Sequence, residues 1–91
     1  MASRRTQYEI FWEILMFCKK KQTFTAIIRY CNLNSKITQD YLDFLLKKEY
    51  ISIIEHNNKK FYLTTDKSEE FIALFTNLYK ELFETSLQKN G

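Results

Sequence analysis

The sequence predicts a small α+β domain, because two closely spaced helices are followed at once by a β-hairpin. The stretch 24–65 contains a short helical segment, a three-residue turn, a longer helical segment and two strand-like runs separated by Asn57-Asn58. Asparagine tolerates the left-handed backbone that tight hairpin turns require. Helix, turn, helix and hairpin in this order predict a winged helix-turn-helix, whose second helix fits a DNA major groove.

The composition is that of one globular domain. The 91 residues include no proline and one glycine, and 45% are apolar and 16% aromatic. Each buried ring removes about 150–250 Å² from water, so even a short chain of this kind can form a core. Because no linker, repeat or low-complexity segment divides the sequence, we expect residues 1–91 to form a single domain.

The net charge of +3 is unevenly distributed. Residues 1–67 carry twelve Lys and Arg against seven Asp and Glu, whereas residues 68–91 carry two Lys and four Glu. The first part is therefore basic and the second slightly acidic. This polarity is expected of a domain that meets phosphate on one side and protein on the other.

The first helix is predicted over residues 6–19. Thr6-x-x-Glu9 matches a capping box, in which each residue bonds the backbone of the other. Apolar residues then recur at helical spacing as far as Cys18. This helix supplies a predicted buried face.

A basic arm of residues 1–5, with Arg4 and Arg5 exposed, is expected to precede that helix and to be flexible. The apolar run 10–18 is too short to cross a membrane, which takes about 20 apolar residues, and no signal-peptide cleavage site follows it. We therefore expect a cytoplasmic, nucleoid-associated protein that does not enter a membrane.

The sequence contains two cysteines, Cys18 and Cys31, both at apolar helical positions. We interpret them as reduced, buried thiols, with a redox switch or a metal site as the alternative. A zinc site needs about four ligands, and two Cys and one His do not supply them. The sequence also lacks a Gly-rich phosphate loop and a His paired with a nucleophile. We expect no metal, no cofactor, no small-molecule substrate and no enzymatic activity.

The helix-turn-helix begins with a second helix predicted over residues 26–31, with Thr25 as its N-cap and a short extended segment at Phe24. Asn32-Leu33-Asn34 forms the turn. Asn34 is a favourable N-cap for the helix that follows.

The third helix, residues 35–47, is the candidate recognition helix. In this fold the N-terminal residues of the recognition helix contact base edges. Here those are Ser35, Lys36 and Gln39, and Gln can pair with adenine and Lys with guanine. At about 100° per residue the inward side is expected to comprise Ile37, Thr38, Tyr41, Phe44 and Leu45, flanked by Leu42 and Leu46.

Two carboxylates share the outward side of this helix. Asp40 and Asp43 offset the charges of Lys36 and Lys47, so this side is close to neutral. A solvated surface with i,i+4 pairs such as Asp43 with Lys47 explains the same residues. DNA recognition and simple solvation therefore both remain open for this helix.

The other candidate DNA contacts are basic or polar side chains that could reach the phosphate backbone. They are Arg29 on the second helix, Lys19, Lys20 and Lys21 after the first helix, and Asn58, Lys59 and Lys60 at the hairpin tip. Simple solvation is the alternative for these lysines, and at the hairpin lysine also protects an exposed edge strand.

The last helix is predicted over residues 65–88. Some 22 residues at ~1.5 Å each span roughly 33 Å, which is longer than a core of this size can cover. The part 78–87 is expected to overhang with Tyr79, Leu82 and Phe83 exposed, and exposed aromatic surface of this kind marks an interface. The expected homodimer interface comprises Phe75, Leu78, Tyr79, Leu82 and Phe83. The alternative is that this helix folds back over the first helix and that the chain is monomeric.

Two stretches, NLNSKITQDYLDFLLKKEYI and FYLTTDKSEEFIALF, resemble small archaeal winged-helix proteins. These include the roughly ten-kilodalton Sulfolobus chromatin-type dimers and the archaellum-regulator-type domains. The resemblance covers about residues 8–83, and its main positions are Asn32-Leu33, Tyr41-Leu42, Leu45-Leu46, Ile51 and Tyr62-Leu63-Thr64-x-x-Lys67. It implies a homodimer that binds double-stranded DNA and is joined by its C-terminal helices.

Two positions depart from that pattern. Glu49 and Ser68 stand where those proteins usually have glycine, so Glu49 is expected to adopt a left-handed backbone at some cost. The overall prediction is a homodimeric DNA-binding protein, either a transcriptional regulator or chromatin-associated. The alternative is a winged-helix protein-interaction module that does not bind DNA.

Overall fold

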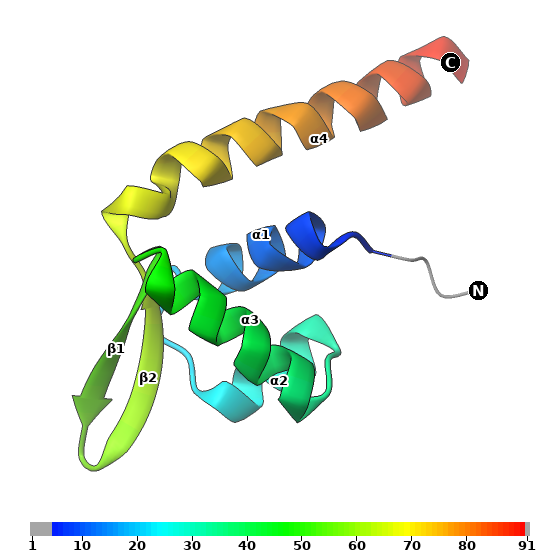
Figure 1. The fold of residues 1–91 in the computed structure, drawn as a ribbon. Helices are drawn as coiled ribbons and strands as arrows, with labels where there is room; N and C mark the ends of the chain where they lie inside the picture. Colours follow the sequence, from blue (N-terminus) through cyan, green and yellow to red (C-terminus); the bar gives the residue numbers. More distant parts are fainter. Residues whose placement is uncertain (1–4, 91) are drawn as a thin grey trace.

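A computed structural model describes residues 5–90 of the chain, with side chains from residue 5 to residue 81. The elements follow the order α1 (Gln7–Phe17), α2 (Phe24–Cys31), α3 (Ser35–Lys47), β1 (Ile51–His56), β2 (Lys59–Thr64), the 3₁₀ turn η1 (Asp66–Ser68) and α4 (Glu69–Asn90). The hairpin β1–β2, called the wing below, extends to one side of the three packed helices, and α4 runs back past α1 (Figure 1). The predicted winged helix-turn-helix with a long C-terminal helix is confirmed.

Side-chain caps define where the first three helices begin. The Thr6–Glu9 capping box is confirmed, because the Glu9 N–H donates to Thr6 Oγ1 at 3.0 Å and the Thr6 N–H donates to Glu9 Oε1 at 2.8 Å. Asn34 caps α3 as predicted, accepting from the Ile37 N–H at 2.8 Å. These local rules are visible in the sequence and determine the local structure.

The predicted start of the second helix is wrong by two residues. Thr23, not Thr25, is the N-cap, and its Oγ1 accepts from the Ala26 N–H at 3.2 Å. Phe24 therefore belongs to α2. The extended position is Gln22, which exchanges two backbone hydrogen bonds with Tyr62 at 3.0 and 2.7 Å. That bridge to the wing ends the loop and leaves Thr23 at the helix start.

Two other helix boundaries also differ from the predictions. α1 ends at Phe17 rather than near Lys19, with Cys18 as its C-cap. α4 begins at Glu69 rather than at Thr65, because the 3₁₀ turn η1 intervenes. Ser68, where glycine was expected, is buried in this turn and donates from Oγ to the Thr65 carbonyl at 2.8 Å. The hydroxyl is thus satisfied inside the fold.

Left-handed backbone occurs at the predicted positions. Asn57 and Asn58, with φ of 53° and 65°, form the two-residue turn of the wing. Glu49 has φ of 65° and follows α3, as expected. Its carbonyl accepts from Thr65 Oγ1 at 2.7 Å and its carboxylate pairs with Lys67 at 3.3 Å. These contacts help to hold Glu49 in a conformation that glycine adopts more easily.

The core lies between the three helices and the base of the wing. Its members are buried apolar side chains: Ile10, Phe11, Ile14, Leu15, Cys18, Ile27, Cys31, Leu42, Leu45, Ile51, Tyr62 and Ile72. They come from every helix and from both strands. The packing of this cluster determines which side of each helix faces inward.

The predicted inward side of α3 is rotated from the observed one. Thr38, Leu42 and Leu45 form the buried stripe, whereas Ile37 and Phe44 are 38% and 40% exposed. Thr38 can be buried because its Oγ1 donates to the Asn34 carbonyl at 2.8 Å. Phe44 lies at the edge of this buried stripe and stacks on Phe11, with the two ring centroids 5.1 Å apart.

The prediction that Arg5 belongs to a free, exposed arm is wrong. Its guanidinium is partly buried, forms an ion pair with the Glu13 carboxylate and donates to the Cys31 carbonyl at 2.6 Å. Arg5 therefore connects the start of α1 to the end of α2. Residues 1–4, including Arg4, lie outside the described residues.

Both cysteines are free and fully buried, which confirms the interpretation as core thiols. Burial raises the pKa of Cys18 to about 12 and the pKa of Cys31 to about 11. The Cys31 thiol adds to the effect on Cys18, and the Glu13 carboxylate adds to that on Cys31.

These pKa values predict that the folded state loses stability in alkali. Above pH 9 the unfolded chain loses the Cys18 proton, whereas the folded chain keeps it. The free energy of unfolding is therefore unaffected by ionisation of this thiol below pH 9 and falls as the pH rises from 9 toward 12. The slope is at most about 1.4 kcal/mol per pH unit for one thiol. Urea unfolding between about pH 8 and pH 11 should show a shallower decline in Cys18→Ala than in the wild type. Equal slopes would contradict this assignment.

α4 is anchored to the domain by Trp12. The indole stacks on Phe75 and Tyr79 with centroids 5.6 and 5.3 Å apart, and its Nε1 donates to Thr76 Oγ1 at 2.9 Å. The expectation that Tyr79 lies exposed on an overhang is therefore wrong, and the alternative packing over the first helix is correct for this part of α4. Leu78, at the start of the part expected to overhang, is exposed, whereas the side chains of Leu82 and Phe83 lie outside the described residues.

Candidate nucleic-acid interface

The outward face of α3 is defined here as Ser35, Lys36, Gln39, Asp40 and Asp43, all of which are exposed. The cap at Asn34 starts the helix immediately before Ser35, so these side chains occupy about its first two and a half turns. The three predicted base contacts are thus on the solvent side of α3, near its N-terminus. A helix with this exposure can enter a major groove with its N-terminal residues toward the bases.

The two carboxylates on this face each contact a candidate DNA-binding residue. Gln39 Nε2 donates to Asp43 Oδ1 at 2.9 Å, and Lys36 Nζ lies 3.6 Å from Asp40 Oδ2. The suggested Asp43–Lys47 pair is not among the ion pairs of the described residues. Asp43 lies four residues from both Gln39 and Lys47, and it accepts a hydrogen bond from the Gln39 side-chain amide.

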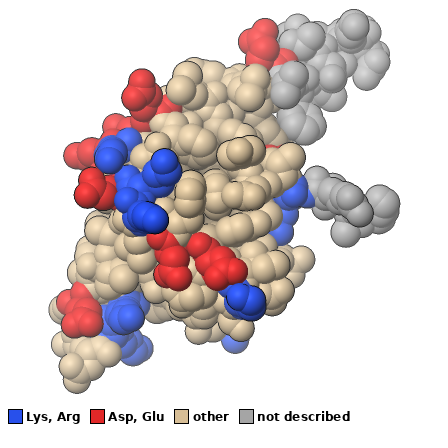
Figure 2. Space-filling view, viewed as in Figure 1, with Lys and Arg blue, Asp and Glu red and all other residues tan. Residues whose placement is uncertain are grey.

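Acidic and basic groups alternate across the side of the molecule that Figure 2 presents. Red side chains lie between separate blue groups, so no continuous basic surface covers this view, and the wing at the lower left carries both signs. The ionic contacts on α3 are consistent with this pattern, because one lysine is already paired within the chain. Electrostatic attraction on this side must come from discrete positions.

Ile37 is an exposed residue that the sequence pattern placed inside. It is the third residue of α3 and 38% exposed. The signal that could have identified it is Thr38, since a threonine four residues after Asn34 can bond the Asn34 carbonyl and be buried without loss. An inward Thr38 turns Ile37 by about 100° toward the edge of the helix.

The wing places its two lysines on different faces. In the antiparallel register His56 pairs with Lys59, and Glu55 pairs with Lys60. Paired residues share a face and neighbours along a strand alternate, so Lys59 and Lys60 point in opposite directions. Both lie beside the Asn57-Asn58 turn and are exposed. Of the two, Lys60 is the one with a carboxylate opposite it.

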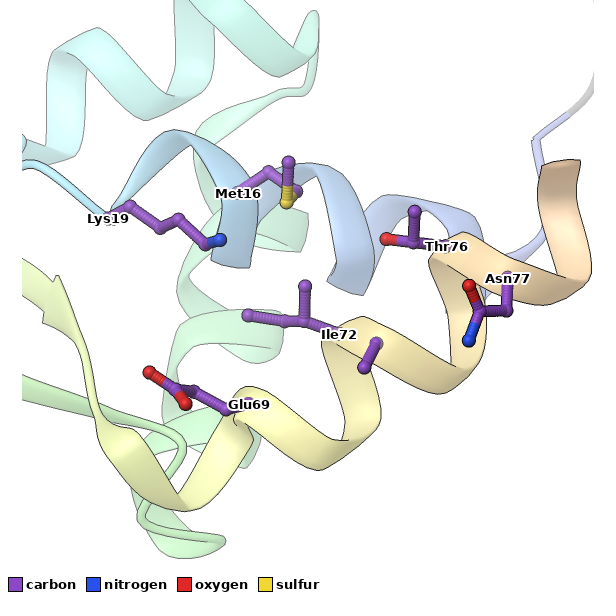
Figure 3. Close-up of a pocket in the computed structure, with 7 residues that line it drawn as sticks. Met16, Lys19, Glu69, Ile72, Thr76 and Asn77 are labelled. Carbon is purple, nitrogen blue, oxygen red and sulfur yellow. The ribbon is translucent and has the colours of Figure 1, made fainter.

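The three lysines after α1 diverge. Lys21 lies over the Phe61 ring of the wing, with Nζ 4.9 Å from the centroid, so it shares the wing face of Lys59. Lys19 points into a groove between α1 and α4 (Figure 3). Lys20 borders a neighbouring hollow beside Phe17 and Tyr30, which Lys19 also lines. The structure therefore brings Lys21 to the wing and separates it from Lys19, while Arg29 is exposed on α2.

The α1–α4 groove is open and has a volume of about 430 Å³. Met16, Ile72 and Ala73 supply apolar walls, and Lys19 and Glu69 bring opposite charges to one end (Figure 3). Within residues 5–81 no three metal-ligating side chains come together. The groove lies where α4 packs against α1, and the residues that line it do not form a metal site.

Across the described part of the chain, no helix has the length and apolar character that crossing a membrane requires.

Comparison with known proteins places this geometry in a family. The winged helix-turn-helix family matches residues 4–83. The chain is 33% identical to Sso10a-2, a DNA-binding protein from Sulfolobus solfataricus, over 92% of this chain and 96% of that one, with a TM-score of 0.65. A search of curated proteins gives no match.

Two bacterial structures share the fold at lower identity. One is MepR, a transcription regulator of the Staphylococcus aureus multidrug efflux pump MepA, at 15% identity and a TM-score of 0.75 over 91% of this chain and 62% of that one. The other is a single-residue mutant of Lactococcus lactis ZitR, at 14% identity and a TM-score of 0.75 over 97% and 65%. From the match over residues 4–83 and the near full-length relative, the chain belongs to the winged helix-turn-helix family.

Proposed function

We propose that this chain binds double-stranded DNA, with α3 in the major groove and the wing against the phosphate backbone. The observation that carries the proposal is the relative at 33% identity, which is a DNA-binding protein and aligns over nearly the full length of both chains. The family assignment also agrees with the expectation that the chain is not an enzyme. Its site of action would be the nucleoid.

The geometry supports a division of roles between the two elements. Ser35, Lys36 and Gln39 are exposed at the N-terminal end of α3, where winged-helix proteins contact base edges. Lys21 and Lys59 share one face of the wing, so they can bind phosphates together. Phosphate contacts position the protein, and base contacts determine its sequence preference.

The direct test is a titration of a fluorescent duplex of about 20 base pairs with the full chain at ~50 mM salt. Polarisation should rise with a micromolar or tighter Kd, because non-specific binding alone reaches about 10⁻⁴ to 10⁻⁶ M at physiological salt and strengthens as salt falls. A flat titration to ~100 μM chain would refute duplex binding.

We further propose that two chains associate through α4. Leu74 and Leu78 are 65% and 56% exposed, lie four residues apart, and continue the line of the half-buried Phe71. Large apolar side chains exposed at helical spacing are typical of a helix–helix interface. Phe75 and Tyr79 of the expected interface contact Trp12 instead, so their role would be to hold α4 in place. A twofold dimer would present two copies of α3 to one duplex.

One observation favours a second candidate, a protein-interaction module without DNA binding. The outward face of α3 carries paired charges of both signs rather than a basic surface. Under this alternative the chain would still self-associate through α4 but would fail the duplex titration. The duplex titration therefore separates the two candidates.

A further inference from the structure

Asp43 is an unexpected residue on a face proposed to enter DNA, because a carboxylate there is repelled by phosphate. It is exposed, it lies in the third turn of α3, and it accepts a hydrogen bond from Gln39 Nε2 at 2.9 Å. That bond fixes a side chain that the proposed function assigns to a base contact. A side chain without an acceptor at this position could not make this bond.

The chemistry of the pair determines which way the Gln39 amide points. An ionised carboxylate only accepts hydrogen bonds, so the nitrogen of the amide, and not its oxygen, must face Asp43. One N–H of the amide is used in this bond. The second N–H and the oxygen Oε1 remain available, one as a donor and the other as an acceptor.

A donor beside an acceptor matches adenine in the major groove. Adenine presents N7 as an acceptor and its N6 amino group as a donor, whereas guanine presents two acceptors, N7 and O6. With its nitrogen held by Asp43, the Gln39 amide can bond both adenine groups and only one of the guanine groups. The arrangement therefore distinguishes the two purines.

We propose that Asp43 is a positioning residue that orients the Gln39 carboxamide for adenine, so that α3 selects an A·T pair at one position of each bound half-site. This inference rests on the proposed DNA binding. The other carboxylate, Asp40, pairs with Lys36 and is not bonded to Gln39. Asp40 thus provides a matched position with the same charge and a different contact.

The test is selection of bound duplexes from a randomised library by the full chain, followed by sequencing. The wild type should enrich adenine over guanine at one position by about 5- to 150-fold, the discrimination of a bidentate contact. Asp43→Ala should reduce that enrichment by about three- to tenfold, the effect of one net hydrogen bond. Asp40→Ala, which frees Lys36 and not Gln39, should leave the enrichment at this position unchanged and alter base preference only at the position that Lys36 contacts.

The affinity for random duplex is a second readout, which should rise in Asp43→Ala while the adenine enrichment falls. Both Asp→Ala variants remove one negative charge from α3, so both should bind random duplex more tightly than the wild type. Tighter binding with unchanged adenine enrichment in Asp43→Ala would overturn the positioning role and leave only charge repulsion. Asp43→Asn keeps an acceptor oxygen without the charge and should retain more enrichment than Asp43→Ala.

A double substitution shows whether Asp43 acts through Gln39. In a Gln39→Ala background, Asp43→Ala should cause no further change in base preference. A further change would mean that Asp43 contacts a base itself, and would overturn the proposal. A wild type that binds duplex without any preference also overturns it while leaving DNA binding intact, whereas failure to bind any duplex defeats the proposed function first.

Discussion

Replacing Lys59 and Lys60 together by glutamine should weaken binding to every duplex by about 10- to 100-fold at ~0.1 M salt. Each phosphate contact contributes about 0.9 to the slope of log K against log salt, which corresponds to somewhat less than tenfold per contact at this salt concentration. Both lysines are exposed beside the turn of the wing, so the substitutions leave the core intact. Random and specific duplexes should be affected alike, because phosphate contacts carry no base information.

Polarisation titrations of the single and double variants measure this effect. Lys80→Gln is the control, since Lys80 is exposed on α4 and distant in sequence from the wing. Lys59 should account for the larger share, because it lies on the wing face of Lys21 while Lys60 lies opposite Glu55. If the wing variants bind as tightly as Lys80→Gln, the wing has no part in DNA binding.

Substituting Leu74 and Leu78 together by glutamate should convert the chain from a dimer to an 11.1 kDa monomer at micromolar concentration. Two carboxylates in an apolar helix–helix interface would be desolvated without partners, which association cannot compensate. Both leucines are more than half exposed within one chain, so the fold itself should survive. Sedimentation equilibrium reports the mass, and circular dichroism reports the helix content.

Lys80→Glu is the matched control for the dimer prediction. Lys80 is exposed on α4 and, at about 100° per residue, lies about 120° around the helix from Leu74 and about 160° from Leu78. This variant should remain dimeric. A wild-type chain that sediments as a monomer, or a leucine double variant that stays dimeric, would contradict the proposed interface.

Locally determined features were predictable from sequence. The capping box at Thr6 and Glu9, the cap at Asn34 and the Asn57-Asn58 turn depend on residues only a few positions apart. The left-handed Glu49 was expected because it follows a helix at a position where similar archaeal proteins usually have glycine. Because these rules act over short separations, the order of elements followed from them.

Features that depend on distant residues were not predictable. Thr23 and Thr25 are both acceptable caps, and the choice between them depends on the bridge from Gln22 to Tyr62. Arg5 was expected to be free because its partner carbonyl is on Cys31, 26 residues away. No local pattern in the chain indicates such contacts.

The same distinction applies to the candidate site. The exposure of Lys36 and Gln39 on α3 could be predicted from the sequence, but the bond from Gln39 to Asp43 could not, because Lys47 is an equally spaced partner for that carboxylate. Three consecutive lysines suggested one basic cluster, but Lys21 lies against the wing, whereas Lys19 and Lys20 line neighbouring hollows beside α1. A run of lysines in the sequence therefore predicts a local positive charge, but not where each side chain points.

The most direct test of the central claim is the salt dependence of affinity for a random duplex between ~50 and ~300 mM salt. If Lys21, Lys59 and other basic residues of the wing and of α2 and α3 neutralise about four or five phosphates, log K should fall against log salt with a slope of about −4 or steeper. A slope flatter than about −1, or no measurable binding at the lowest salt, would contradict DNA binding by this winged helix.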